Sequence, residues 1–248
     1  MNHVHYTRLV VVGVGGGWRT PRDLAFFLSY FMTEAVLVIV DGGVYRSRQR
    51  DHEHFAMPGN KARIQAEFVR DAFPGLGIEA IRKYVATKNG EQVVSVEELL
   101  LPGDVVFLQV DNNRTRNLVA EHARQLSDVT LISGGTNEDQ LRVMVYLRRG
   151  HQDITPPFSA YCDEIARPAD ESPSERLSQQ EGCFEQIEAE HVHPFTMLAT
   201  STFMLNAFYA VWKLESAGRL ADFPFQELWY DIATGRCRTE VLIPVNAT

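Results

Sequence analysis

The sequence predicts an α/β protein with a doubly wound, mostly parallel, Rossmann-like sheet and helices on both faces. Short, continuously apolar runs alternate with helical patterns through about residue 135. Glycine clusters or acidic residues end these runs, as at the carboxyl ends of buried parallel strands. Beyond residue 139 we expect antiparallel strands and a long apolar helix. The 248 residues suffice for a single domain, 1–248.

The first apolar run, 9–12, ends in a cluster of four glycines. They are Gly13, Gly15, Gly16 and Gly17. Glycines allow a tight turn and leave room for a phosphate close to the main chain. A helical pattern follows over about 21–32, so we expect a strand, turn and helix that bind a nucleotide. A glycine turn that serves packing alone is the alternative.

The second apolar run, 35–40, stops at Asp41. Nucleotide-binding folds place there the carboxylate that receives the ribose hydroxyls. An aspartate that caps a turn at 42–43 is the alternative. The following loop, 42–55, is dense in arginine and histidine, which suits polyphosphate or a solvated surface.

Lys61 begins the next predicted helix, which continues over 62–73. The helix dipole makes this position unfavourable for a cation. We therefore interpret Lys61 as a phosphate ligand, with a surface lysine as the alternative.

Three further strands complete the predicted core. We expect them over 78–85, 104–110 and 129–133, with a short helix over 96–101 and a closing turn at Gly134 and Gly135. The ends of the strands that precede residues 13, 41 and 111 should then meet along one edge of the sheet. The nucleotide-binding core is expected to span 6–138.

Asp111 is the predicted metal ligand. It follows a buried strand, opposite the glycine turn, where one carboxylate can hold Mg²⁺ against a triphosphate. An aspartate that caps the next helix is the alternative.

The C-terminal part, 139–248, has a different pattern. We expect a strand over 140–149, a mobile loop over 151–182 and a long apolar helix over 195–214. A hairpin formed by 225–232 and 238–243 should close the chain.

The overall charge limits the classes of partner. A net charge of −8 disfavours nucleic acid and anionic lipid, and no apolar run approaches the roughly 20 residues of a membrane span. The first residues show no signal-peptide pattern. Three cysteines without a Cys-x-x-Cys pair provide neither a disulfide framework nor a four-cysteine zinc site. We expect a cytoplasmic protein with no nucleic-acid or membrane partner.

Four motifs together resemble the ThiF/MoeB/HesA superfamily, the bacterial relatives of ubiquitin-activating enzymes. The motifs are 12–17, 38–42 with Phe55 downstream, 59–62 and 107–116. The last, which contains Asp111, Asn112 and Arg116, is the most specific. The likeness spans roughly 6–150 and continues more weakly through 195–214.

The resemblance implies ATP and Mg²⁺ as cofactors and a homodimer, which the apolar helix also favours. The C-terminal glycine carboxylate of a ubiquitin-like or sulfur-carrier protein would attack the α-phosphate, giving an acyl-adenylate and pyrophosphate. Lys61, Asp111, Arg50 and Cys183 are the implied catalytic residues. The glycines, Asp41, Gln49, Lys61, Asn112 and Arg116 would bind the nucleotide. An unreactive Cys183 is the alternative.

The loop after Asp41 departs from the family pattern. Gln49, His52 and Glu53 stand where relatives carry Asn and then Arg-Gln, so an arginine among Arg46, Arg48 and Arg50 would supply the cation. This departure favours a second hypothesis, a non-catalytic nucleotide-binding dimeric scaffold. A nicotinamide-dependent oxidoreductase is a third, because the glycine spacing permits it.

Overall fold

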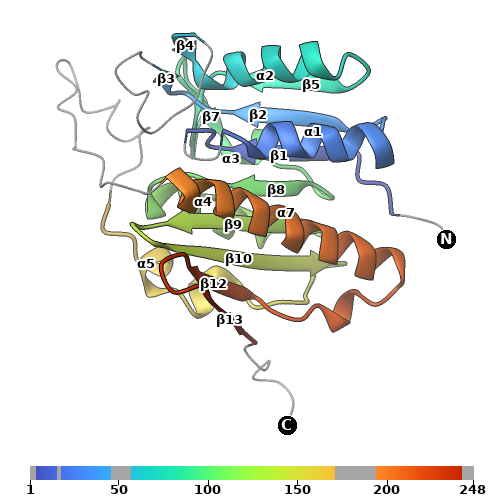
Figure 1. The fold of residues 1–248 in the computed structure, drawn as a ribbon, viewed down its shortest axis with the longest axis vertical. Helices are drawn as coiled ribbons and strands as arrows, with labels where there is room; N and C mark the ends of the chain where they lie inside the picture. The colour runs from blue at the N-terminus through green and yellow to red at the C-terminus, as the bar shows by residue number, and fades with distance from the viewer. Residues whose placement is uncertain (1–3, 16–17, 46–56, 171–193, 242–248) are drawn as a thin grey trace.

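The computed structural model describes residues 4–15, 18–45, 57–170 and 194–241, which form a three-layer α/β arrangement around one large sheet (Figure 1). Its parallel half has the strand order β5–β2–β1–β8–β9. These strands are Arg8–Val12 (β1), Val36–Val40 (β2), Gly77–Ile81 (β5), Val105–Leu108 (β8) and Val129–Thr136 (β9). The chain adds strands outward from β1 in both directions, which confirms the doubly wound prediction.

Three antiparallel strands extend the sheet beyond β9 in the order β10–β12–β13. They are Gln140–Arg149 (β10), Glu227–Asp231 (β12) and Arg236–Glu240 (β13), and the short strand Gln152–Asp153 (β11) also pairs with β10. The predicted C-terminal antiparallel strands are confirmed.

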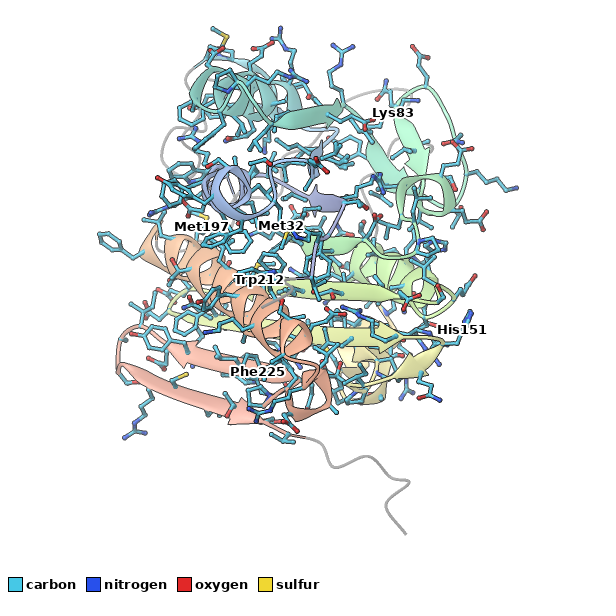
Figure 2. The ribbon with its side chains drawn as sticks, turned by 90° about the vertical axis from the view of Figure 1, so that its right-hand side faces the viewer. Met32, Lys83, His151, Met197, Trp212 and Phe225 are labelled. Atoms are coloured by element: carbon cyan, nitrogen blue, oxygen red, sulfur yellow. The ribbon has the colours of Figure 1, made fainter. Side chains whose placement is uncertain are left out.

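Helices cover both faces of the sheet (Figure 2). One face carries Thr20–Phe31 (α1), Lys61–Ala72 (α2) and Pro194–Ser216 (α7). The other carries Val96–Leu99 (α3), Asn113–Ala123 (α4), the 3₁₀ turn Phe158–Ala160 (η2) and Asp163–Ala166 (α5). Leu9 and Val11 of β1 face the first layer, and Val10 and Val12 face the second, as strand alternation requires.

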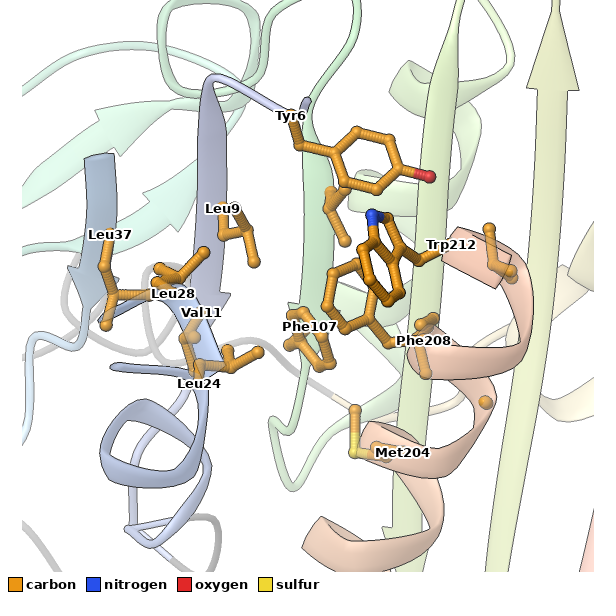
Figure 3. Close-up of a cluster of buried hydrophobic side chains, with 14 of the residues drawn as sticks. Tyr6, Leu9, Val11, Leu24, Leu28, Leu37, Phe107, Met204, Phe208 and Trp212 are labelled. Carbon is orange, nitrogen blue, oxygen red and sulfur yellow. The ribbon is translucent and has the colours of Figure 1, made fainter. Parts of the chain in front are cut away.

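Helix α7 packs over the centre of the sheet through one buried side (Figure 3). Phe208 contacts Phe107 at a ring-centroid distance of 5.6 Å, and Trp212 is buried against α1. Thr202 and Asn206 on the same helix are exposed, so α7 is not apolar on every side. Within the described residues, no helix has the length and apolarity needed to cross a membrane.

Three segments differ from the sequence prediction. The run 78–85 divides into β5 and Tyr84–Ala86 (β6), and β6 pairs with Val93–Ser95 (β7) in a separate small sheet. Gly134 and Gly135 continue β9 rather than close it. A Cβ atom at Gly134 would lie 2.4 Å from Met204 Sδ, so this glycine lets α7 approach the strand.

The third difference concerns the loop expected over 151–182. Its described part, 151–170, folds into β11, η2 and α5, so the prediction of a mobile loop is wrong for these residues. Phe158, Cys162 and Ile165 are buried there against the face that carries α4. Residues 171–182 lie outside the described residues.

Candidate functional site

The candidate site lies where the strand order reverses, between the carboxyl ends of β1 and β8. Open α/β sheets bind ligands at this point. Gly13 N–H donates to Val40 O at 2.9 Å, and Gln109 N–H donates to Val12 O at 2.8 Å. Gly13 has φ +83°, and a Cβ atom there would lie 2.8 Å from Gln109 O. The turn therefore requires glycine for both its conformation and its close contact with β8.

Asp41 joins the glycine turn to the end of β2. Its Oδ2 accepts a 2.8 Å hydrogen bond from Val14 N–H, and its Oδ1 accepts a 2.7 Å bond from Gly43 N–H. The predicted capping of a turn at 42–43 is thus present. The bond to Val14 adds a second contact that spans 27 residues. Each carboxylate oxygen retains a second lone pair that can accept from a ligand hydroxyl.

Lys61 is brought to the same place by a small two-stranded sheet. Val44–Tyr45 (β3) pairs with Gly59–Asn60 (β4), and Lys61 N–H donates to Gly43 O at 3.0 Å. The methylene atoms Cδ and Cε of Lys61 lie 3.5 Å from the position of a Cβ atom at Gly43. Asn60 accepts from Arg63 N–H at 3.0 Å and caps α2. Lys61 is therefore the first residue of α2, as predicted, beside Asp41.

Asp111 lies across the switch point, after β8, and its side chain is exposed. The alternative that Asp111 caps α4 is wrong, because Asn112 does so: its Oδ1 accepts from Thr115 N–H at 2.8 Å. Asn112 Nδ2 also donates to Asp111 Oδ1 at 3.2 Å. Asn112 itself is buried. The structure thus leaves the Asp111 carboxylate exposed at the edge where a metal–phosphate complex would bind.

Arg116 is buried beneath this edge. Its guanidinium donates to Ser133 Oγ and to the carbonyls of Val110 and Gly134. Burial lowers the pKa of Arg116 to about 10, while the negative charge of Asp111 opposes that shift. These hydrogen bonds hold the backbone immediately before Asp111 in place. Arg116 therefore supports the position of Asp111.

A second polar group connects the glycine turn to α2. The Arg22 guanidinium lies 3.8 Å from the ring centroid of Phe68 and 4.7 Å from that of Trp18. Arg22 Nε donates to Gln65 Oε1 at 3.2 Å. Burial lowers the pKa of Arg22, although Asp23 opposes the shift. This stack holds the residues after the glycine turn against the helix that Lys61 begins.

One buried atom at this edge favours a polar ligand. Among the described residues, Gln65 Nε2, Gln109 Oε1 and Gln226 Nε2 are buried without a hydrogen-bond partner. A buried polar atom that makes no hydrogen bond lowers the stability of the fold by about 1–3 kcal/mol, so its presence calls for a functional explanation. Gln109 follows β8 directly and lies against Gly13, within the switch point. Its free acceptor fits a ligand that supplies an N–H or O–H donor.

The site also fits Mg²⁺ bound together with phosphate. No group of three or more His, Cys, Asp or Glu within the described ranges is arranged to hold a metal ion. Mg²⁺ with a nucleotide, however, commonly uses one or two carboxylates, with phosphate oxygens and water completing its shell. Asp111 can supply the carboxylate. The residues present therefore suit a metal that arrives with a nucleotide, rather than a permanent protein cage.

Several predicted site residues lie outside the described residues. They are Gly16, Gly17, Gln49, Arg50 and Cys183. Their assigned roles stay predictions. The described ones fall into two groups that meet at the contact between Gly13 and Gln109: Gly13, Gly15, Asp41 and Lys61 on one side, and Asp111, Asn112 and Arg116 on the other.

Sequence reasoning missed Gln109 and Asp170. Gln109 is two residues before Asp111 in a recognised motif, so a polar residue at the end of an apolar strand was the available signal. Asp170 lies in the segment expected to be mobile. Its carboxylate contacts α4 across 57 residues of sequence, and no local pattern predicts such a contact.

No protein-family model matches this chain, and no curated protein matches it in sequence. The fold, in contrast, has many relatives among solved structures. A crystal structure of selenomethionine PaaA matches with a TM-score of 0.60 at 14% identity, over 96% of this chain and 73% of PaaA.

E. coli MccB has the same fold. Its structure with ATP matches with a TM-score of 0.63 at 9% identity, over 97% of this chain and 65% of MccB. The microcin C7 biosynthetic enzyme MccB in complex with N-formylated MccA matches at 10% identity and a TM-score of 0.63. The chain thus spans about two thirds of the length of MccB. At these identities the comparison establishes the fold: this chain has the α/β architecture of PaaA and MccB.

Proposed function

We propose that this protein is an ATP- and Mg²⁺-dependent adenylyltransferase that activates the C-terminal carboxylate of a small protein or peptide. One observation carries the proposal: the glycine turn, Asp41, Lys61 and Asp111 all lie around the β1/β8 switch point. The order of the four sequence motifs supports the same assignment. A structural neighbour, MccB, has been crystallised with ATP and with AMPCPP.

In the proposed reaction, a carboxylate oxygen of the substrate attacks the α-phosphorus of ATP. The bond from that phosphorus to the bridging oxygen breaks, and pyrophosphate leaves with the bonding electron pair. The backbone of the glycine turn and Asp41 bind the nucleotide, and Lys61 offsets phosphate charge. Asp111 would hold Mg²⁺, which would supply positive charge to the leaving phosphates. Positioning and charge neutralisation are the main requirements of this chemistry.

The proposed partner is a ubiquitin-like or sulfur-carrier protein. Its support is the resemblance of the motifs, and MccB, a neighbour in fold, has been crystallised together with MccA. We assign Arg50 to the phosphates, and Cys183 to attack on the adenylate or to sulfur transfer. Both assignments rest on the resemblance alone.

We further propose that the protein acts as a homodimer. Helix α1 exposes at least half of the surface of three aromatic residues, Phe26, Tyr30 and Phe31. Tyr209 of α7 is also exposed. Ring contacts connect Phe26 to Tyr30, Tyr30 to Phe31, and Tyr209 to the buried Trp212. Contiguous exposed aromatic surface is typical of an interface. Light scattering should give the mass of a dimer for the wild type and of a monomer for Tyr30→Glu. A monomeric wild type at high concentration would refute the proposed homodimer.

Exchange of labelled pyrophosphate into ATP tests the function directly. We expect exchange only when Mg²⁺ and a carrier protein with a C-terminal glycine are both present, and we expect Asp111→Ala and Lys61→Ala to abolish it. Nucleotide binding without exchange for any carrier would favour the dimeric scaffold. Binding of NAD in place of ATP would favour the oxidoreductase.

A further inference from the structure

Asp170 provides a cap for helix α4 from a distant part of the chain. Its Oδ2 accepts from Asn113 N–H at 2.6 Å, and its Oδ1 accepts from Arg114 N–H at 3.0 Å. These are the first two amides of α4, which has no intrahelical acceptor for them. A carboxylate here also interacts favourably with the positive end of the helix dipole.

The segment that precedes Asp170 is firmly packed. Cys162 and Ile165 are buried in the same cluster as Val119, Ala120 and Ala123 of α4. The chain therefore runs beside α4 through α5 and returns to its N-terminus at Asp170. The cap depends on this packing.

The capped end of α4 immediately follows Asp111. Asn112 connects the two: its Oδ1 accepts from Thr115 N–H, and its Nδ2 donates to Asp111 Oδ1. From the other side, Arg116 holds the Val110 carbonyl, and its charge interacts with both Asp111 and Asp170. The amides of Asn113, Arg114 and Thr115 are thus all held by side chains, and Asp170 supplies two of the three contacts.

We propose that Asp170 is a positioning residue for nucleotide binding, which fixes the start of α4 and thereby holds Asp111 where it can bind Mg²⁺ with ATP. This inference rests on the proposed function and adds to it a residue that is not part of the recognised motifs. Without the carboxylate, two amides lose their acceptor and the first turn of α4 frays. Within the part of the chain that the structure describes, the position of Asp111 then depends on the contacts of Asn112 and Arg116.

The first test uses the ligand-free protein. Asp170→Ala should speed amide hydrogen exchange at Asn113, Arg114 and Thr115 by about 5- to 30-fold, the factor expected for loss of a helix cap. Asp170→Asn keeps one acceptor oxygen and should give an intermediate rate. Asp163→Ala is the matched control, because Asp163 is exposed on α5 and pairs only weakly with Arg167. Unchanged exchange in Asp170→Ala would overturn the inference.

The second test follows the Mg²⁺ requirement of ATP binding by calorimetry. Asp170→Ala should raise the Mg²⁺ concentration for half-saturation by about 5- to 30-fold, with little change in ATP affinity without Mg²⁺. When Asp111 is already replaced by alanine, Asp170→Ala should leave the Mg²⁺ concentration for half-saturation almost unchanged, because the two residues act through one site.

An unchanged Mg²⁺ requirement, or a full effect of Asp170→Ala in the Asp111→Ala background, would overturn the inference and leave the proposed function intact. A wild-type protein that does not bind ATP with Mg²⁺ would overturn both.

Discussion

The Val14 amide donates a 2.8 Å hydrogen bond to the carboxylate of Asp41, which joins the turn after β1 to the end of β2. The same carboxylate accepts from Gly43 N–H at 2.7 Å. Because Lys61 N–H bonds to Gly43 O, one aspartate connects the glycine turn, the β2 turn and the start of α2. The residues assigned to nucleotide binding are thus held together by hydrogen bonds within the chain.

Asp41→Ala should destabilise the protein and weaken ATP binding together. Two hydrogen bonds to a carboxylate are lost, so we expect the free energy of unfolding to fall by about 1–3 kcal/mol in urea denaturation. Asp222→Ala is the control, since its ion pair with Arg219 is at the surface and should be worth less than about 1 kcal/mol. Equal losses in the two variants would refute the bridging role of Asp41.

Gly13→Ala should be far more damaging than its size suggests. The residue has φ +83°, and the added methyl would lie 2.8 Å from Gln109 O, which is backbone and cannot move aside cheaply. We expect a loss of about 1–3 kcal/mol in unfolding free energy, from strain. Gly75→Ala is the matched control, because no atom lies within 4 Å of its Cβ position. A Gly13→Ala protein as stable as Gly75→Ala would contradict the geometry of the turn.

Gln109→Met should separate stability from binding. The substitution removes a buried acceptor that has no partner among the described residues and keeps a similar shape, so the ligand-free protein should gain up to about 1 kcal/mol. Nucleotide affinity should fall at the same time. Thermal unfolding with and without ATP measures both effects. A variant that is less stable and binds ATP normally would show that Gln109 serves only the fold.

Glu215→Gln should change the acid stability of the protein. Glu215 forms a bidentate ion pair with Arg149, at 2.6 and 2.8 Å, and accepts from the Tyr6 hydroxyl. Burial raises the pKa of Glu215, but the hydrogen bonds from Arg149 and Tyr6 outweigh it and lower the pKa below its ordinary 4.5. The ionised Glu215 therefore contributes fully to the free energy of unfolding above about pH 4.5. This contribution is lost as the pH falls through the lower pKa that Glu215 has in the folded protein.

Guanidinium unfolding at pH 7 should show Glu215→Gln to be less stable than wild type by about 3 kcal/mol, since one partner of a largely buried pair is removed. The difference should shrink as pH falls below 4.5. The exposed Glu91, as Glu91→Gln, provides the control. A difference that is independent of pH would contradict an ionised Glu215 in the folded protein.

The parallel half of the sheet was predictable because its signals are local. Short apolar runs without polar alternation that are rich in β-branched residues, such as 36–40 and 105–108, indicate buried strands, and their alternation with helices indicates a parallel sheet. Gly134 misled the prediction because a glycine usually ends a strand. Here it is required within β9 by the close approach of Met204 on α7, a contact between segments 70 residues apart.

Part of the site was also predictable from local signals in the sequence. Lys61 and Asp41 follow from their places at a helix start and a strand end. The structure brings Asp41 to the glycine turn and Lys61 to Gly43, beside Asp41. Arg116, expected to bind the nucleotide, is instead buried among backbone carbonyls. Asp170 was missed because its role exists only once α5 packs against α4.

Calorimetric titration of the wild type and Asp111→Ala with ATP, each with and without Mg²⁺, tests whether the β1/β8 switch point binds ATP together with Mg²⁺. NAD serves as the comparison ligand. We expect saturable ATP binding to the wild type that strengthens with Mg²⁺, and an affinity at least about tenfold lower for Asp111→Ala. ATP binding that is identical in the two proteins, or saturable binding of NAD alone, would contradict this expectation.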